Sequence, residues 1–210
     1  MNRKIKNALI SVSDKKDLKN ILNVLRKYKI NIISSGGTYR SIKKLGFKCK
    51  EVSEYTGFDE MLDGRVKTLH PKIHSGILFN RKKVTHKKQM MKKKFESIDL
   101  VIVNFYPFKE TLKKTFNNKK IIENIDIGGP SMVRAAAKNC EDVVVITDKN
   151  DYLDFIKEIK KYRGKTSLNF REKLAAKAFS LTAFYDSMIT EWYNQKLEIK
   201  FPERKIFFGK

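Results

Sequence analysis

The chain has few of the residues and segments that mark secreted, membrane-spanning or metal-binding proteins. Its 210 residues include two cysteines, Cys49 and Cys140, whose spacing forms neither a metal-binding motif nor a disulfide framework. No apolar run reaches the roughly 18 residues that a transmembrane helix needs. The basic start, Met1–Lys6, is followed only by the short apolar run Ala8–Val12, which is too short for a secretory signal. We therefore expect a protein of the reducing cytoplasm with no membrane partner.

Acidic residues are also scarce. Lysine and arginine number 46 against 23 aspartates and glutamates, which gives a formal net charge of +23. Such a charge is typical of nucleic-acid-binding proteins, which gain affinity by releasing counterions from phosphates. The densest basic run, Lys82–Lys94, lacks the interleaved aromatic residues that would stack on bases. We therefore favour a lysine-rich surface without a nucleic-acid partner, whose positive field attracts an anionic nucleotide.

The order of the apolar runs predicts an α/β fold. Hydrophobic residues make up 41% of the chain, which is enough to bury a core. Short β-branched runs alternate with amphipathic stretches, and this alternation predicts a mainly parallel sheet between two helical layers, a three-layer α/β/α architecture. The expected strands are Ala8–Val12, Asn31–Ser34, Lys50–Val52, Leu100–Asn104 and Val143–Thr147.

Helical patterns follow these strands and continue beyond the last one. Helices are expected over Thr38–Leu45, Asp151–Tyr162 and, as one long element, Leu168–Gln195. We expect one nucleotide-binding domain over residues 1–165 and a helical extension over residues 166–210 that packs on it or on a second subunit. The apolar stripe expected on the long helix consists of Ala175, Ala176, Phe179, Ala183 and Phe184.

Polar clusters follow the first two expected strands. Because ligands of parallel sheets bind at the carboxyl ends of strands, both clusters are expected at one binding edge. Paired glycines let backbone N–H groups converge on an anion, and the next helix N-terminus adds a favourable dipole. The clusters indicate a phosphate site with Lys15 as countercharge, although such glycine pairs also occur in plain strand-to-helix turns. The residues concerned are Ser13, Asp14, Lys15, Ser35, Gly36, Gly37 and Thr38.

A third polar cluster begins at Asn104, where the fourth expected strand ends. The Asn104 amide offers a donor and an acceptor that suit a base edge or a carboxamide. In the alternative interpretation, Asn104 caps the strand and Tyr106 fills the core. From these residues alone we favour that alternative.

Residues 64–71 form a segment dense in cations. Arg65 and Lys67 are two residues apart, so in an extended segment they share a face and can clamp a phosphate or carboxamide oxygen. His70 and His74 raise the question of a metal. The proline between them disfavours a regular helix, and no third ligand is evident, so we expect no metal.

Two glycines also precede the helical run Met132–Asn139. Gly128 and Gly129 allow close backbone approach at a helix start, and Asp126 can act there as a base or as a hydrogen-bond acceptor. Lys138 follows three alanines, and a buried lysine beside a pocket can have its pKa lowered into the working range. The commoner role of such a lysine is to face solvent from an amphipathic helix.

Together these clusters resemble the IMP cyclohydrolase domain of the bifunctional purine-synthesis enzymes. The resemblance rests on the strings SVSDK, SGGT, TGF-EML-GRVKTLHPKIH, N-YPF and ENIDIGGPSMVRAAAKN, in order and at similar spacing from Ala8 to Trp192. It implies a methylglyoxal-synthase-like fold, a homodimer, and neither a metal nor an organic cofactor. The implied reaction is the dehydrative ring closure of 5-formamidoimidazole-4-carboxamide ribonucleotide (FAICAR) to IMP.

The resemblance also implies a role for individual residues. The phosphate and ribose would be bound by Ser13, Asp14, Lys15, Ser35, Gly36, Gly37 and Thr38. The same pocket would be lined by Arg65, Val66, Lys67 and Thr68. The base would contact Val103 and Asn104, and the reacting carboxamide would contact Asp126 and Ile127. The catalytic group would be Lys138, with Lys67, Tyr106 and Asp126 close by.

The chain departs from this family mainly in length. The family continues into a formyltransferase domain, whereas this chain stops at Phe207–Lys210, so we expect formyl transfer to be supplied elsewhere or by a missing domain. Two rival functions share the fold: a lyase acting on a triose phosphate, and a non-catalytic nucleotide sensor. The lyase would not need the strings GRVKTLHPKIH and IDIGG, and the sensor could lack the four expected catalytic residues. The cyclohydrolase is therefore favoured.

Overall fold

A five-stranded parallel sheet forms the centre of the fold. In the computed structural model, which describes residues 1–199, the strand order is β4-β3-β2-β5-β6. Every neighbouring pair is parallel, so the carboxyl ends of the strands meet at one edge. The parallel sheet predicted from the sequence is confirmed. Its strands are β2 (Asn7–Val12), β3 (Asn31–Ser34), β4 (Lys50–Glu51), β5 (Leu100–Asn104) and β6 (Val144–Ile146).

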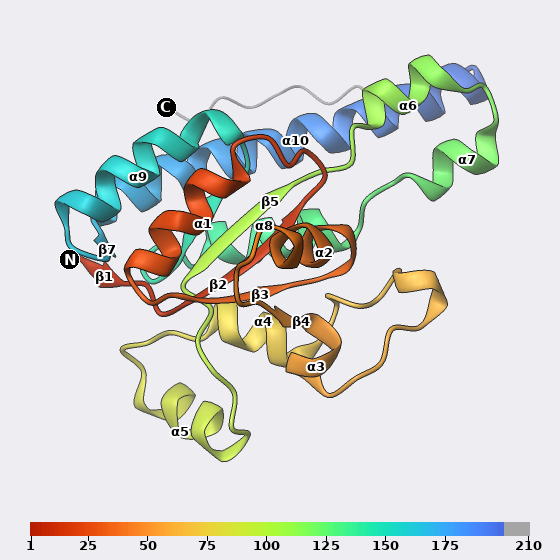
Figure 1. The fold of residues 1–210 in the computed structure, drawn as a ribbon. Helices are drawn as coiled ribbons and strands as arrows, with labels where there is room; N and C mark the ends of the chain where they lie inside the picture. Colours follow the sequence, from red (N-terminus) through yellow and green to blue (C-terminus); the bar gives the residue numbers. More distant parts are fainter. Residues whose placement is uncertain (200–210) are drawn as a thin grey trace.

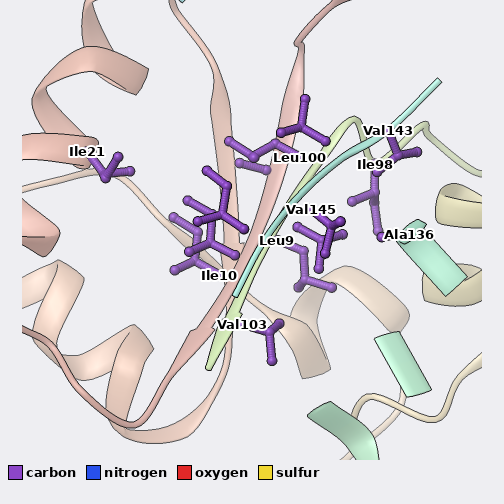
Figure 2. Close-up of a cluster of buried hydrophobic side chains, with 14 of the residues drawn as sticks. Leu9, Ile10, Ile21, Ile98, Leu100, Val103, Ala136, Val143 and Val145 are labelled. Carbon is purple, nitrogen blue, oxygen red and sulfur yellow. The ribbon is translucent and has the colours of Figure 1, made fainter. Parts of the chain in front are cut away.

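Helices cover both faces of this sheet, so the three-layer α/β/α architecture is also confirmed (Figure 1). Figure 2 shows Ile21 of α1 on one side of the strands and Ala136 of α8 on the other. Helix α9 packs against α1, and α4 packs against α8. The helices are α1 (Leu18–Lys27), α2 (Gly36–Lys44), α3 (Val52–Thr56), α4 (Pro71–Leu78), α5 (Val84–Lys92), α6 (Phe108–Lys114), α7 (Asn118–Glu123), α8 (Gly128–Lys138), α9 (Tyr152–Lys161) and α10 (Leu168–Leu197), with 3-10 turns η1 (Leu62–Gly64) and η2 (Lys149–Asp151).

The central strands are apolar on both sides because both sides are covered. Leu9 and Ile10 of β2 are fully buried, and so is Leu100 of the adjacent β5 (Figure 2). Burial of one such side chain stabilises a fold by about 1.5–3 kcal/mol. This main core fixes the carboxyl ends of β2 and β5, where the polar residues begin.

Two segments that the sequence suggested as loops are helix starts. Gly36 and Gly37 form the first turn of α2, which begins two residues before the expected helix. Pro71 is the first residue of α4, and the Nδ1 atom of His70 caps that helix by accepting a hydrogen bond from the Lys72 N–H at 3.1 Å. Proline suits this position because its missing N–H has no helical partner there. The expectation that it disfavours a regular helix through both His70 and His74 agrees with this start, since only His74 lies inside α4.

Four of the five positions in the apolar stripe predicted for α10 are not buried against the domain, and packing of the stripe on a second subunit stays a prediction. Ala176, Phe179, Ala183 and Phe184 are exposed, and Ala175 is buried. Alanine is abundant on both faces of this helix, so the stripe could not be read from apolar residues alone. The end of the predicted extension lies outside the described residues. The buried positions are Arg171, Leu174, Ala175, Ala178, Thr182, Tyr185 and Trp192.

A smaller core lies beside the main one and packs α6 and α7 against the second half of α10 (Figure 1). Its buried members are Phe108 of α6, Ile121 of α7, and Tyr185 and Trp192 of α10. The segment between β5 and α8 therefore depends on α10 for its packing. We call these four residues the small core.

The N-terminus is tied to the start of α10. Strand β1 (Arg3–Lys4) pairs antiparallel with β7 (Lys165–Thr166), and this pair was not predicted. The guanidinium of Arg171 is fully buried, and backbone carbonyls satisfy its donors. No helix within residues 1–199 is long and apolar enough to cross a membrane. The carbonyl oxygens bound by Arg171 belong to Met1, Cys140, Glu141 and Thr166, at 2.6–3.2 Å.

Candidate functional site

A cavity of about 730 Å³ opens at the carboxyl edge of the sheet. The ends of β2 and β5 and the starts of α2 and α8 line it, together with residues 63–65, 67–68 and 122–127. Its place is the one at which parallel sheets bind ligands. Of the residues expected in the site, it brings together Ser13, Lys15, Ser35, Gly36, Gly37, Thr38, Arg65, Lys67, Thr68, Val103, Asn104, Tyr106, Asp126 and Ile127.

Asn104 holds the loop after β2 in place. Its Oδ1 accepts hydrogen bonds from the Ser13 N–H at 2.6 Å, from the Ser13 hydroxyl at 2.8 Å and from the Asp14 N–H at 3.2 Å. Its Nδ2 donates to the Asp14 carbonyl at 3.3 Å. Because the amide is engaged on both sides, the structure supports the interpretation that Asn104 is a cap, whereas the accompanying expectation that Tyr106 fills the core was wrong, since Tyr106 is exposed. Its contact with a base stays a prediction.

Thr38 and Ser34 join the neighbouring strand and helix. The Thr38 hydroxyl accepts from the Val12 N–H at 3.0 Å and donates to the Val12 carbonyl at 2.9 Å. The Ser34 hydroxyl donates to the Ile10 carbonyl at 2.6 Å. Both hydroxyls are buried, so they position the N-terminus of α2 against the end of β2.

Two ammonium groups lie at the N-terminus of α2. The Lys67 Nζ is 3.3 Å from the position that a Cβ would take at Gly36, and the Lys15 Nζ is 3.9 Å from that position at Gly37. Gly36 also has a left-handed φ of +53°, which a residue with a side chain adopts only under strain. A helix N-terminus flanked by two lysines attracts an anion. We call these four residues the anion cradle.

Carboxylates contact the two cations that precede α4. Lys67 lies 3.5 Å from an oxygen of Glu60, and Arg65 forms a two-point ion pair with Glu123 at the end of α7. Residues 65–68 form a turn and not the extended segment expected from their spacing. Arg65 and Lys67 nevertheless both line the cavity, whereas Val66 does not.

Asp126 is a partly buried carboxylate in the cavity wall. Its backbone N–H donates to the Tyr185 hydroxyl at 2.8 Å, and its Oδ1 accepts from the Gly129 N–H at 2.8 Å. Burial raises the pKa of Asp126 above its usual value, while hydrogen bonds from the Gly129 and Tyr106 N–H groups act in the opposite direction. A raised pKa brings a carboxyl group closer to the range in which a general base works.

The glycines at the start of α8 leave room for this carboxylate. A Cβ at Gly129 would collide with the Asp126 carboxylate, and one at Gly128 would collide with the Thr68 hydroxyl. The structure thus packs the start of α8 against both Asp126 and the segment that carries Lys67. Backbone approach of this kind requires glycine.

The two histidines near the cavity contact the backbone. His70 caps α4, and the half-buried His74 interacts with the backbone of Thr68. Burial lowers the pKa of His74, so its neutral form is favoured. Within residues 1–199, no group of three or more His, Cys, Asp or Glu side chains is placed to hold a metal ion.

Lys138 lies away from the cavity. It is the last residue of α8, its side chain is exposed, and it does not line the cavity. Ten residues of helix separate it from Gly128, a distance of about 15 Å at 1.5 Å per residue. The structure therefore does not bring Lys138 together with Asp126 within one chain.

Asp14 faces a second, more open hollow of about 700 Å³ beside the first. Its carboxylate binds the Lys149 ammonium at 2.7 Å, and this hydrogen bond lowers the pKa of Asp14. Lys177, also in this hollow, pairs with Asp148 and Asp151. These charged side chains form ion pairs with one another. Their charges are therefore already neutralised and do not indicate a ligand site in this hollow.

Several residues of the cavity were not identified from the sequence. Glu123 pairs with Arg65, Met132 lines the cavity from α8, and Tyr185 contacts the Asp126 backbone from α10. Of these three residues, only Glu123 could have been identified from the sequence, because it begins the string ENIDIGG that contains Asp126. No local pattern links Tyr185 to Asp126, because 59 residues separate them.

Comparison with known proteins places the chain in a family. The model of the MGS-like domain matches residues 17–131, and the model of the AICARFT/IMPCHase bienzyme matches residues 136–209. The crystal structure of ForH superposes with a TM-score of 0.80 at 30% sequence identity, over 90% of this chain and 99% of that one.

Curated relatives agree with this assignment. The bifunctional purine biosynthesis protein PurH of Bradyrhizobium diazoefficiens is 47% identical over 208 residues, which are 99% of this chain and 39% of that protein. PurH of Persephonella marina is 52% identical over 198 residues, or 93% of this chain and 38% of that protein. The chain thus spans about two-fifths of the length of these relatives. The chain belongs to the MGS-like domain family and resembles, within it, the IMP cyclohydrolase part of PurH.

Proposed function

We propose that the chain is an IMP cyclohydrolase, which converts FAICAR into IMP with loss of water. The observation that carries the proposal is that one cavity holds both an anion cradle and a partly buried carboxylate. Contacts connect the two: Lys67 lies beside Gly36, and the next residue, Thr68, packs on Gly128 beside the Asp126 turn. A ribonucleotide has its phosphate and its reacting groups at opposite ends, and it fits such a site.

The phosphate binds in the anion cradle in this proposal. The α2 N-terminus supplies N–H donors and the positive end of its dipole, and Lys15 supplies charge, whereas Lys67 is assigned to the reacting groups. Ser13 and Ser35 lie at the same edge and suit the ribose and the phosphate oxygens. The net charge of +23 increases the rate at which such an anion arrives.

The reaction joins two groups that are attached to one ring. The carboxamide nitrogen attacks the formyl carbon, and a C–N bond forms. One proton leaves the carboxamide nitrogen and one leaves the formamide nitrogen, and both depart with the formyl oxygen as water. Holding the two groups in the ring plane supplies much of the rate enhancement, because attack is then intramolecular and oriented.

Asp126, Lys67 and Tyr106 are the proposed catalytic residues in this cavity. Asp126, with its raised pKa, accepts the proton from the carboxamide nitrogen. Lys67 stabilises the oxyanion that develops on the formyl oxygen. Tyr106 is 58% exposed at the mouth of the cavity, where its hydroxyl can pass a proton to the departing water.

Lys138 enters this proposal through a second copy of the chain. Arg134 and Lys138 are exposed on one face of α8, and Ile127, its exposed N-cap residue, precedes Arg134 by seven positions. If two copies meet on this face around a two-fold axis perpendicular to α8, the two helices run in opposite directions. The partner's Lys138 then lies beside Gly128, close to Asp126. The homodimer is thus the assembly in which Lys138 can act as a general acid or base.

Mixed dimers test this arrangement. Lys138→Ala and Asp126→Asn chains should each lose most turnover while still binding IMP. When they are mixed and allowed to exchange, the heterodimers regain one complete site, so about a quarter of all sites become active. A mixture that forms heterodimers but stays inactive would exclude a trans role for Lys138.

The main test follows IMP formation from FAICAR spectroscopically with the purified chain. The assay supplies FAICAR directly, so it needs no formyltransferase. Absence of IMP, combined with consumption of dihydroxyacetone phosphate, would favour the lyase. Absence of IMP with tight IMP binding would favour a nucleotide sensor, and DNA binding at physiological salt would assign the charge to nucleic acid.

A further inference from the structure

The small core touches both chain segments that carry the proposed reacting residues. Phe105 and Ile125 both pack against the small core. Phe105 immediately precedes Tyr106, and Ile125 immediately precedes Asp126. These two segments are separated by α6 and α7 in the sequence. Something in the tertiary structure must therefore fix their relative position.

A single side chain of α10 contacts both segments. The Tyr185 hydroxyl accepts the hydrogen bond from the Asp126 N–H at 2.8 Å. The Tyr185 ring lies 5.1 Å from the Phe105 ring, centroid to centroid, in an edge-to-face arrangement, and 6.2 Å from Phe108 in a similar one. Tyr185 is only 3% exposed, so packing holds its ring in this position.

We propose that Tyr185 is a positioning residue, which fixes the Asp126 carboxylate relative to Tyr106 for the ring closure. This inference rests on the proposed function, because it names the residue that aligns the same site. Tyr185 lies in α10, outside the MGS-like match at residues 17–131, so the long helix acts as the support of the reacting end of the cavity.

The hydrogen bonds of Asp126 explain why this anchor matters. On its carboxyl-terminal side, Asp126 is held by the Gly129 N–H at the start of α8. On its amino-terminal side, the hydrogen bond from its own N–H to Tyr185 is the contact that reaches another element. Without that bond the Asp126 backbone loses its link to α10, and its carboxylate keeps only the hydrogen bonds from the Gly129 and Tyr106 N–H groups. Small displacements of a catalytic group reduce turnover strongly.

The test uses Tyr185→Phe, which keeps the ring and removes only the hydroxyl. We expect kcat to fall about tenfold while KM changes by less than about twofold, because the anion cradle is untouched. Amide hydrogen exchange in a peptide spanning residues 122–130 should become faster. Loss of folded protein would also lower the apparent kcat at constant KM, so kcat is expressed per IMP-binding site, counted by titration.

Trp192→Phe is the matched control. Trp192 belongs to the same small core and packs on Phe108 at 6.4 Å. We expect it to lower Tm with kcat near that of the wild type. An equal fall in kcat for Trp192→Phe, or unchanged kcat and exchange for Tyr185→Phe, would overturn the proposal. If the wild-type chain formed no IMP, the proposed function would fail, whereas the exchange measurement would still decide whether Tyr185 anchors the Asp126 segment.

Discussion

The two ends of the cavity are supported in different ways. The anion cradle stands on the main core, where buried strands and the hydroxyls of Ser34 and Thr38 fix the start of α2. The reacting end, with Tyr106 and Asp126, is held by the small core and by a helix that follows it in the sequence. Binding and chemistry therefore depend on separate parts of the molecule, and variants should affect them separately.

The largest expected effect is at the reacting end. Asp126→Asn should lower kcat by about 10²–10⁴-fold, the range typical of a general base, because asparagine cannot accept the proton. IMP affinity should stay near that of the wild type. Steady-state kinetics together with calorimetric IMP titration measure both quantities. A loss of less than about tenfold would remove Asp126 as the base.

Removal of a small-core side chain should loosen the reacting end alone. Trp192→Ala should cost about 3–5 kcal/mol of local stability, because it leaves a cavity under α6. Hydrogen exchange should accelerate over residues 105–127 while β2 and β5 stay protected. Leu9→Ala in the main core is the comparison variant, and it should accelerate exchange across the sheet. Uniform acceleration in both variants would show that the two cores unfold together.

The anion cradle should show the opposite kinetic pattern. Lys15→Ala should raise KM about tenfold with little change in kcat, because its ammonium lies beside Gly37 and not beside the reacting groups. Lys16→Ala is the control, since Lys16 carries the same charge but does not line this cavity. Equal effects of the two variants would assign the role of Lys15 to the general positive field.

The smallest expected effect is on stability. Burial raises the pKa of Asp126 above the ordinary value of 3.8, which applies in the unfolded state. At pH values between the unfolded-state pKa and the higher folded-state pKa, the folded state binds more protons than the unfolded state. Stability contributed by this group therefore falls as pH rises through that window. At neutral pH, Asp126→Asn should raise Tm by less than about 5 °C, and the gain should vanish below pH 3.8. Melting curves of both proteins across pH check the sign.

Sequence patterns predicted the strands of the sheet and the start of α2, which depend mainly on local interactions. Strands β3 and β5 have the predicted bounds, and β2 agrees within one residue, because continuous β-branched runs indicate buried parallel strands. The Ser-Gly-Gly-Thr string correctly indicated that a strand end, a helix start and a lysine come together, although the two glycines lie inside the helix. These contacts involve residues close in sequence or at matching strand ends.

The reacting end was predicted less well because long-range packing builds it. Asp126 was identified from its glycines, but its contact with Tyr185 depends on how α10 lies on α8. The exposed positions of Phe179 and Phe184 show that composition did not reveal which face of α10 is buried. Lys138 was expected beside Asp126, and the length of α8 separates the two within one chain.

The buried guanidinium of Arg171 has a consequence for how this protein is made. It binds the carbonyl of Met1, 170 residues earlier in the chain, as well as the turn at Cys140 and Glu141. While a ribosome is still synthesising the sheet, these carbonyls have no such partner, so the first strand pair cannot be locked before α10 has emerged. Completion of the fold therefore waits for the same helix that supports Asp126, and a nascent chain stalled before residue 171 should remain sensitive to protease.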